Sequence, residues 1–446
     1  MIKSIVTNRL KFTLGLLVLF LVSYILGINL IIPLFLLCMV IYLKFSCREY
    51  RLLQLSLFFV IIFVLSYFII KNGWPTFYIP FVAIPMLSAI LFGELELSLL
   101  LVLASSVSIA YLAHDIHLGI LFFISGLIAS ILVRNGRRRS IIIRTGFIVG
   151  AVQILALFFI ERFKIGYPIG YLMFMLNGVV SAVIVIGILP IFEYLFSTVT
   201  NISLLELADF NQPVLQRMIM EAPGTYHHSL IAGNLSEAAC AAVGANALLA
   251  RIGAYYHDIG KLDKPEYFIE NQEKTSKHDA LSPSMSKMVI MNHVDKGIEL
   301  AKKYRLNPRL IDFIRQHHGT SLVYYFYRKA LETLEEDQEI KEEGFRYPGP
   351  KPNTKETAIV LLADSVEAAT RSLKEHTPNN VKDLVHKVVN NKFIDGQLDE
   401  CDLTLKDLER ISEIFIRILS GIYHPRLTYP EGQVKSSENN HKKPAK

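Results

Sequence analysis

Cysteine is scarce in this chain of 446 residues, and its four cysteines are widely scattered. They are Cys38, Cys47, Cys240 and Cys401. No two of them form a CxxC pair, and their spacing suggests neither a disulfide framework nor a zinc knuckle. We therefore expect ordinary reduced thiols, and the features that define the fold have to be found elsewhere.

Charged residues are scarce before residue 198, where long apolar runs dominate. With 52% hydrophobic residues and a mean hydropathy of +0.37, the chain is too apolar for an ordinary soluble protein. A bilayer core needs roughly 20 apolar residues per helix. Eight segments meet or approach this length: 10–26, 29–44, 55–70, 76–93, 97–113, 117–134, 143–160 and 171–196.

Two details qualify these spans. The apolar run from Phe12 to Leu43 lacks a signal-peptide cleavage site, so we expect it to stay in the mature protein. The short break at 27–29 also allows seven spans plus a re-entrant segment. Pro80, Pro85 and Pro190 are expected to kink their helices.

Lysine and arginine gather at three places that set the orientation. They are Lys3, Arg9 and Lys11 before the first span, Lys44, Arg48 and Arg51 after the second, and Arg134, Arg137, Arg138, Arg139 and Arg144 after the sixth. With eight spans, all three clusters and everything after residue 198 lie on one side. We therefore predict a multi-pass membrane protein with a cytoplasmic C-terminal half. Such loops also explain the net charge of +6 without a nucleic-acid polymer as partner.

Ionisable residues are nearly missing from the middle of the predicted spans. Those in the first half lie mainly in short connections, as Glu94, His114 and Asp115 do. A transport pathway would place such groups within the spans. Hairpin turns are therefore the favoured interpretation, and transport is disfavoured.

Strand-like alternation is hard to find after residue 198. Apolar residues instead recur every three or four positions in 228–243, 246–259, 284–304, 308–318, 355–373 and 404–422. The predicted fold class is all-α, with a multi-span transmembrane region followed by a helical bundle. The acidic stretch 333–353 is interpreted as a solvated insertion or loop.

Histidine is concentrated in the second half, where seven of the 13 histidines fall between residues 227 and 318. His257 is followed directly by Asp258, and His317 by His318. Adjacent residues on a helix point about 100° apart, so each pair can reach two metal ions more easily than it can chelate one. Two divalent ions can clamp a phosphodiester and hold a bridging hydroxide, and Asp258 is suited to bridging them.

Several motifs occur in a fixed order around these pairs. They are Glu221-Ala222-Pro223-Gly224-Thr225-Tyr226-His227-His228-Ser229, His257-Asp258, His293, Gln316-His317-His318-Gly319-Thr320 and Ala363-Asp364-Ser365-Val366-Glu367. This set resembles the HD-domain superfamily and, more closely, the bacterial seven-transmembrane HD hydrolases. The runs 347–350 and 395–404 resemble the same family. The resemblance covers Leu204 to Tyr429 and the multi-span region before it.

The resemblance implies an HD-superfamily phosphohydrolase with two divalent metal ions. One ion is held by His228, His257, Asp258 and Asp364, and the other by Asp258, His293, His317 and His318, which leaves His227 and His278 as non-ligands. Histidine-rich sites with two bridged ions suit iron or manganese. In this interpretation the metals activate water, and the hydroxide attacks phosphorus in line. Asp258 and His257 are the central catalytic residues.

The implied substrate is the cyclic dinucleotide cyclic di-AMP, hydrolysed to linear pApA. Lys261, one turn beyond the metal-binding pair, is a candidate catalytic and phosphate-binding residue, and Arg371 is a second candidate for substrate binding. The alternative for both is a solvated surface side chain.

Two other functions stay open. The first is hydrolysis of another signalling nucleotide, such as a guanosine polyphosphate or cyclic di-GMP. The run after His318 lacks the Gly-Tyr-Pro continuation expected of HD-type cyclic di-GMP enzymes, which argues against the latter. The second is a membrane receptor that binds a nucleotide without cleaving it, although all the expected ligands are present.

The expected domains are a transmembrane region at 1–197 with about eight helices, a coupling linker or helix at 198–222, a cytoplasmic HD phosphohydrolase domain at 223–430 and a disordered tail at 431–446. Family members commonly carry a large extracellular domain after the first span, and the chain lacks room for one there. Signal input is then expected through the lipid-embedded spans, from the cytoplasm or through a homo-oligomer.

Overall fold

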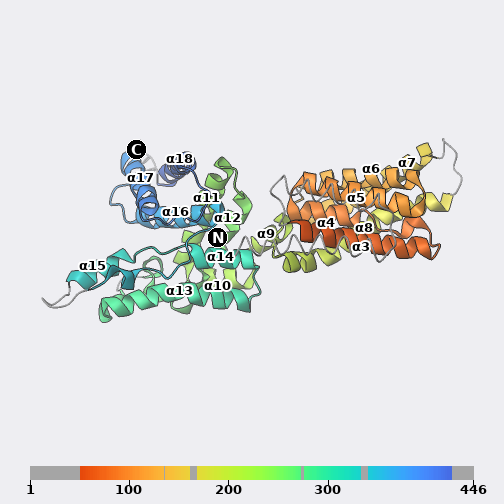
Figure 1. Ribbon diagram of the computed structural model, residues 1–446. Helices are drawn as coiled ribbons and strands as arrows, with labels where there is room; N and C mark the ends of the chain where they lie inside the picture. The colour runs from red at the N-terminus through yellow and green to blue at the C-terminus, as the bar shows by residue number, and fades with distance from the viewer. Residues whose placement is uncertain (1–50, 135, 161–167, 273–275, 333–339, 424–446) are drawn as a thin grey trace, which may run out of the picture.

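The computed structural model describes residues 51–134, 136–160, 168–272, 276–332 and 340–423. Within these ranges the chain is helical, and its β structure is a single bridge between Leu322 and Arg346. A bundle of α3 to α8 and a second body of α10 to α18 are joined by α9 (Figure 1). The predicted all-α class is confirmed.

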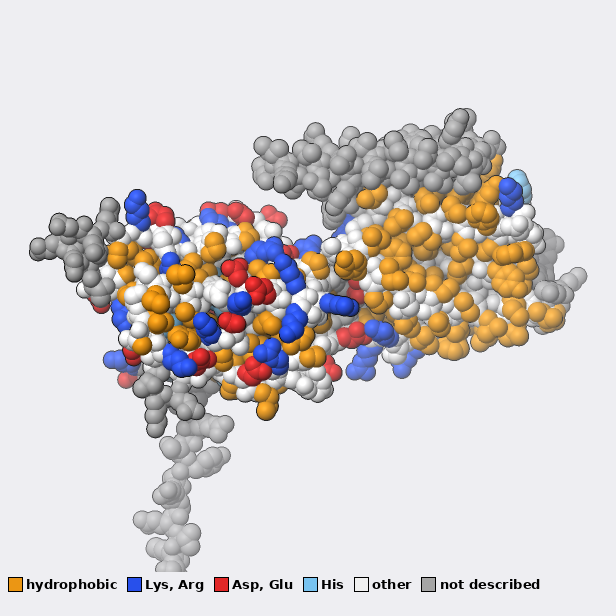
Figure 2. Space-filling view, turned by 90° about the horizontal axis from the view of Figure 1, so that it is seen from below, with side chains coloured by type: hydrophobic (Ala, Val, Ile, Leu, Met, Phe, Trp, Pro, Cys, Tyr) orange, Lys and Arg blue, Asp and Glu red, His pale blue; other side chains and the backbone are white. Residues whose placement is uncertain are grey.

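Five helices of the first bundle are long and apolar enough to cross a membrane. They are α3 (Leu52–Lys71), α5 (Leu95–Ala113), α6 (Ile116–Val133), α7 (Arg139–Ile160) and α8 (Pro168–Phe196). Their outward side chains are apolar, as at Phe68, Phe159 and Ile191, which are more than half exposed. Figure 2 shows a broad hydrophobic surface over this bundle and a mosaic of charge over the second body.

The chain is therefore a multi-pass membrane protein, and the predicted spans at 55–70, 97–113, 117–134, 143–160 and 171–196 are confirmed. The two spans expected before residue 45 lie outside the described residues.

The predicted span 76–93 is not one continuous helix. It consists of a 3-10 turn, η2 (Thr76–Tyr78), a short irregular stretch and α4 (Ala83–Phe92), whose 10 residues rise only about 15 Å. Pro80 lies in the interrupted stretch, where it has no backbone N–H to donate. Asn177 Nδ2 donates to the freed carbonyls of Phe77 and Ile79, at 2.8 Å each. The expectation of a full-length helix here was wrong, because an apolar count does not register lost backbone donors.

The basic residues gather at the end of the bundle that faces the second body. Arg51 precedes α3, and its guanidinium lies 5.0 Å from the ring centre of Phe92 at the end of α4. Arg134 Nε donates to Gly93 O at 2.9 Å. Arg139 at the start of α7 pairs with Glu206 beyond the end of α8. The described members of the second and third basic clusters therefore share one side.

The segment 198–222, expected to be a coupling linker or helix, contains two helices. These are α9 (Asn201–Leu207) and α10 (Pro213–Glu221). Two hydrogen bonds tie this region to the second body: Asn307 Nδ2 donates to Thr198 O at 2.9 Å, and the Tyr256 hydroxyl donates to Leu207 O at 2.8 Å.

In the second body, α11, α12, α14, α17 and α18 pack against α16, whose residues 358–363 are fully buried. Its helices are α11 (Pro223–Ala242), α12 (Ala247–Tyr256), α13 (Pro283–Lys303), α14 (Pro308–Gln316), α15 (Tyr324–Glu332), α16 (Lys355–Arg371), α17 (Pro378–Ile394) and α18 (Leu405–Ile422). Shorter 3-10 turns are η3 (Ile259–Asp263), η4 (Pro265–Tyr267), η5 (Ile269–Asn271), η6 (Lys277–Ala280) and η7 (Glu342–Phe345). The six helices predicted from periodicity are present, although α12 ends three residues before the predicted boundary.

The described part of the predicted loop, 340–353, has little regular structure beyond η7 and several exposed residues, but two buried aromatic side chains anchor it. Phe345 and Tyr347 are only 5% and 8% exposed. Val323 N donates to Phe345 O at 2.9 Å, and Tyr347 N donates to Ser321 O at 3.0 Å. These backbone bonds hold the segment against the loop after His318. Residues 333–339 and 431–446 lie outside the described residues.

Candidate metal centre

His257 and Asp258 stand at the end of α12, where the chain turns into η3. Both side chains are almost completely buried. His257 Nδ1 donates to Ala254 O at 2.6 Å, so its Nε2 points inward, 3.2 Å from Asp258 Oδ2. Gly260 lets η3 approach α13 closely, since a Cβ there would lie 1.8 Å from His293 O.

His293 on α13 and His317 after α14 meet the other side of Asp258. His293 Nδ1 lies 2.5 Å from Ile290 O, and His317 Nδ1 lies 2.8 Å from Ile314 O. Donation to these carbonyls leaves the Nε2 lone pairs facing each other at 3.1 Å, with Asp258 Oδ1 at 3.4 and 3.5 Å. Lone pairs this close repel each other unless a cation or proton lies between them.

His228 on α11 completes the cluster with two carboxylates from α16. Its Nε2 lies 3.0 Å from Asp364 Oδ1, and its Nδ1 is hydrogen-bonded to Glu367. A carboxylate behind an imidazole orients the ring and raises its basicity as a metal ligand. The sequence analysis assigned no role to Glu367. The available signal was its i, i+3 spacing from Asp364, which places both on one helix face.

Two sets of side chains bring their ligand atoms within 4.8 Å of one another. They are His228, His257, Asp258 and Asp364, and Asp258, His293, His317 and His318. These are the sets that the family resemblance implies, and they share Asp258. His227 is exposed, and His278 Nε2 donates to Tyr267 O at 2.9 Å instead, so neither joins a set.

The donor atoms suit divalent cations. His257 Nε2 and Asp258 Oδ1 are buried and have no hydrogen-bond partner. A buried polar atom without a partner costs free energy, and a bound cation would satisfy both atoms. Imidazole nitrogen with shared carboxylate oxygen is a donor set that first-row transition metals accept.

Charge is strongly coupled across the cluster. Burial opposes protonation of His228 and His257, but the carboxylates outweigh it and raise their pKa values to about 9 and about 10. Burial lowers the pKa of His293 to about 4. Although burial favours neutral carboxyls, the surrounding cations hold the pKa values of Asp258 and Asp364 well below their ordinary range. Both carboxylates are therefore ionised at neutral pH.

Lys261 and Arg371 both lie at the cluster. Lys261 Nζ is 2.8 Å from Asp258 Oδ2 and 2.7 Å from Glu270 Oε1, and its side chain is 12% exposed. Arg371 Nε donates to Glu367 Oε1 at 2.6 Å. Neither is a free surface cation, and Glu270 was not foreseen from the sequence.

A cavity of about 430 Å³ opens onto the cluster. Its lining combines metal-set residues with apolar and charged groups: His228, Lys261, Phe268, Ile269, Glu270, Ile290, His293, His318, Tyr347, Asp364, Glu367, Ala368, Arg371 and Ser372. Its size is within the range of small-molecule sites. His318 is the most exposed member of either metal set, at 23%.

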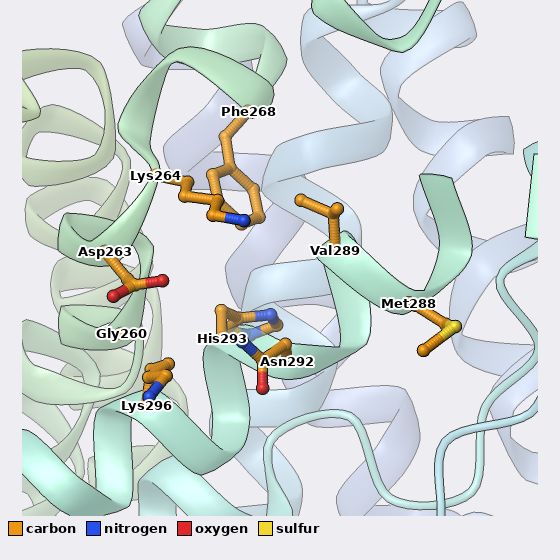
Figure 3. A pocket seen from close by; sticks show the side chains of 9 residues that line it. All are labelled: Gly260, Asp263, Lys264, Phe268, Met288, Val289, Asn292, His293 and Lys296. Carbon is orange, nitrogen blue, oxygen red and sulfur yellow. The ribbon is translucent and has the colours of Figure 1, made fainter. Parts of the chain in front are cut away.

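A second cavity of about 330 Å³ shares only Phe268 and His293 with the first. Figure 3 shows Asp263 and Lys264 on one side of it and Val289 and Asn292 of α13 on the other. Since its only shared metal-set residue is His293, the larger cavity is the one that gives access to both sets.

Comparison with known families gives two matches. Residues 2–200 match the family described as "7TM receptor with intracellular HD hydrolase", and residues 225–369 match the HD domain.

Two curated relatives share the name "Cyclic-di-AMP phosphodiesterase PgpH". The protein of Bacillus subtilis (strain 168) is 46% identical over 325 residues, which is 71% of this chain and 45% of that protein. The protein of Listeria monocytogenes serotype 1/2a (strain 10403S) is 38% identical over 391 residues, or 85% of this chain and 53% of that one. The chain thus spans about half the length of these relatives.

A solved structure of the L. monocytogenes PgpH HD domain in complex with cyclic di-AMP is 46% identical. It covers 49% of this chain and 100% of its own, with a TM-score of 0.46.

Proposed function

Because this chain belongs to the family of seven-transmembrane HD hydrolases, we propose that it is a metal-dependent phosphodiesterase that hydrolyses cyclic di-AMP to linear pApA. The observation that supports this most strongly is the pair of buried ligand sets that share Asp258 beside an open cavity. The substrate follows from the names of the two curated relatives.

The proposed cofactors are two ions of iron or manganese. His228, His257, Asp258 and Asp364 would hold one, and Asp258, His293, His317 and His318 the other. Ions at these places would activate water and stabilise the charge that develops on a phosphodiester.

The chain's own groups prepare this site. Glu367 and the carbonyls of Ala254, Ile290 and Ile314 accept from the outer ring nitrogens, which turns the inner nitrogens toward Asp258 and Asp364. Lys261 offsets the charge of Asp258 and Glu270 and lies in the cavity wall. We assign Lys261 to substrate phosphate and Arg371, farther out on the wall, to a second anionic or polar group of the dinucleotide.

The proposed organisation follows the charge distribution. Arg51 and the cluster at 134–144 lie at the end of the membrane bundle that faces the second body, which we call the HD body from here on. Positive residues favour the cytoplasmic side of a membrane. We therefore place the HD body, at 223–430, in the cytoplasm of a bacterial cell, after a transmembrane region at 1–197 and a coupling segment at 198–222.

The test is turnover by the full chain, purified in detergent and loaded with Mn²⁺ or Fe²⁺. Cyclic di-AMP, cyclic di-GMP and guanosine tetraphosphate are offered in parallel. Conversion of cyclic di-AMP to pApA, abolished by Asp258→Ala, is the expected result. Asp263→Ala is a matched control, because Asp263 is an exposed carboxylate on the same turn and outside both ligand sets.

The other outcomes are separable. Turnover of only another nucleotide would retain the metal centre and overturn the substrate. Binding of metal and cyclic di-AMP without turnover would make the chain a nucleotide receptor.

A further inference from the structure

Tyr347 is the aromatic side chain that covers the outer edge of the metal centre. Its ring stacks on His318, with centroids 4.3 Å apart and planes at 26°, and it stands edge-on to His293 at 6.3 Å. The side chain is 8% exposed and lines the larger cavity. It therefore touches the space in which a substrate phosphate must lie.

The phenolic oxygen of Tyr347 is not used by the fold. No side chain or backbone group in the described ranges is hydrogen-bonded to it, although a buried tyrosine usually finds a partner. The other cationic and hydroxyl donors of the cavity wall each have a protein partner in the described ranges, whereas the Tyr347 hydroxyl has none. Lys261 pairs with two carboxylates, Arg371 pairs with Glu367, and the Ser372 hydroxyl donates to Ala369 O.

The backbone around Tyr347 is fixed from both sides. Tyr347 N donates to Ser321 O at 3.0 Å. Arg346 Nη1 donates to Thr320 O at 3.0 Å, and its guanidinium forms two hydrogen bonds with Asp395, at 2.7 and 3.1 Å. A donor held in place before the substrate arrives loses little free energy in reorganising during the reaction.

We propose that the Tyr347 hydroxyl donates a hydrogen bond to a non-bridging oxygen of the scissile phosphodiester, which makes Tyr347 a catalytic residue. The inference rests on the proposed function, and it assigns to this segment a role beyond packing. A phosphodiester needs neutral or positive donors on its oxygens, and the surrounding carboxylates would otherwise repel it. Tyr347 supplies such a donor beside His318, the most exposed member of the metal sets.

The decisive variant is Tyr347→Phe in the full chain, because it removes the hydroxyl and keeps the ring that stacks on His318. We expect kcat for cyclic di-AMP to fall about 100-fold, as on loss of one oxyanion donor. Metal content and melting temperature should stay as in the wild type. Tyr327→Phe is the matched control, since this ring packs on Phe345 and does not line the cavity.

Two further measurements separate a catalytic hydroxyl from a packing role. Binding of cyclic di-AMP to the metal-free, EDTA-treated chain should weaken about tenfold in Tyr347→Phe, since a hydrogen bond to a charged oxygen is lost. The second measurement compares turnover of the two diastereomers of a monophosphorothioate analogue. Each diastereomer carries sulfur in place of a different non-bridging oxygen, and sulfur is a poor hydrogen-bond acceptor. The wild type should therefore discriminate between them more strongly than Tyr347→Phe does.

Three outcomes would overturn the inference. They are unchanged kcat in Tyr347→Phe, a loss of kcat that follows a loss of metal, and diastereomer discrimination equal to that of the wild type. A wild type that is inactive on cyclic di-AMP would instead overturn the proposed function, and this inference with it.

Discussion

At the scale of single residues, four of the five imidazoles in the two metal sets have a second group behind them. For His257, His293 and His317 that group is a carbonyl of the same or preceding helix turn, which no substitution removes. For His228 it is the side chain of Glu367. Glu367 is therefore the orienting group that a substitution can test.

We expect Glu367→Gln to lower the affinity of the metal set of His228 by about 10- to 100-fold, because the amide is a weaker acceptor than the carboxylate for the ring N–H. Metal content after dialysis at defined free Mn²⁺ measures this. Glu375→Gln, on an exposed loop, is the control. Equal metal retention in both variants would contradict the orienting role.

Metal uptake should release protons. The pKa values of His228 and His257 are raised to about 9 and about 10, so both rings are protonated at pH 7 in the metal-free chain. A metal ion needs the neutral ring. Affinity should therefore rise between pH 7 and 9, about tenfold per pH unit for each proton displaced. Calorimetry in buffers of different ionisation heat counts these protons, and a count of zero would refute the coupling.

At the scale of helices, local patterns predicted most of the fold. Three- and four-residue apolar spacing located the main helices of the second body, and apolar length located five membrane helices. The segment 76–93 failed because Pro80 and its neighbours interrupt a helix that composition alone would continue. The acidic composition before Tyr347 did not predict the buried residues of this segment. Their burial depends on backbone hydrogen bonds to residues 321–323, which composition does not indicate.

The sequence also predicted the candidate site in part. The order of motifs implied both ligand sets, but not the groups behind them. Glu367 meets His228 across 139 positions, and Glu270 reaches Lys261 only through the turn at η5. Such pairings depend on how the helices pack against one another. The spacing of residues along the sequence does not reveal that packing.

Asn307 tests the connection between the membrane exit and the metal centre. It caps α14, with Oδ1 accepting from Arg309 N at 2.9 Å, while its Nδ2 donates to Thr198 O. We expect Asn307→Ala to destabilise the HD body by about 1–2 kcal/mol, because cap and tie are both lost. Asn307→Asp keeps the cap acceptor and loses only the donor.

Thermal unfolding of the full chain measures the first effect, and amide hydrogen exchange at residues 198–207 measures the second. Faster exchange in both variants, with a lower melting temperature mainly in Asn307→Ala, is expected. Exchange at the wild-type rate in Asn307→Asp would show that the tie contributes nothing.

At the scale of the whole molecule, charge separates the two ends of the membrane bundle. The connection between α5 and α6, at His114 and Asp115, lies at the end opposite to Gly93 and Arg134. We predict that alkaline phosphatase fused after His114 is active, while the same enzyme fused after Lys446 is inactive and a fluorescent protein there is bright. The reverse pattern would place the HD body outside the cell.

The hydrogen bond from Asn307 to Thr198 also makes α14 a connection between the two bodies. The helix has nine residues and so rises about 13 Å, with the carbonyl of Thr198 at one end and His317 and His318 at the other. A displacement at the end of α8 would therefore reach two candidate metal ligands through the hydrogen bond of Asn307 and a single helix.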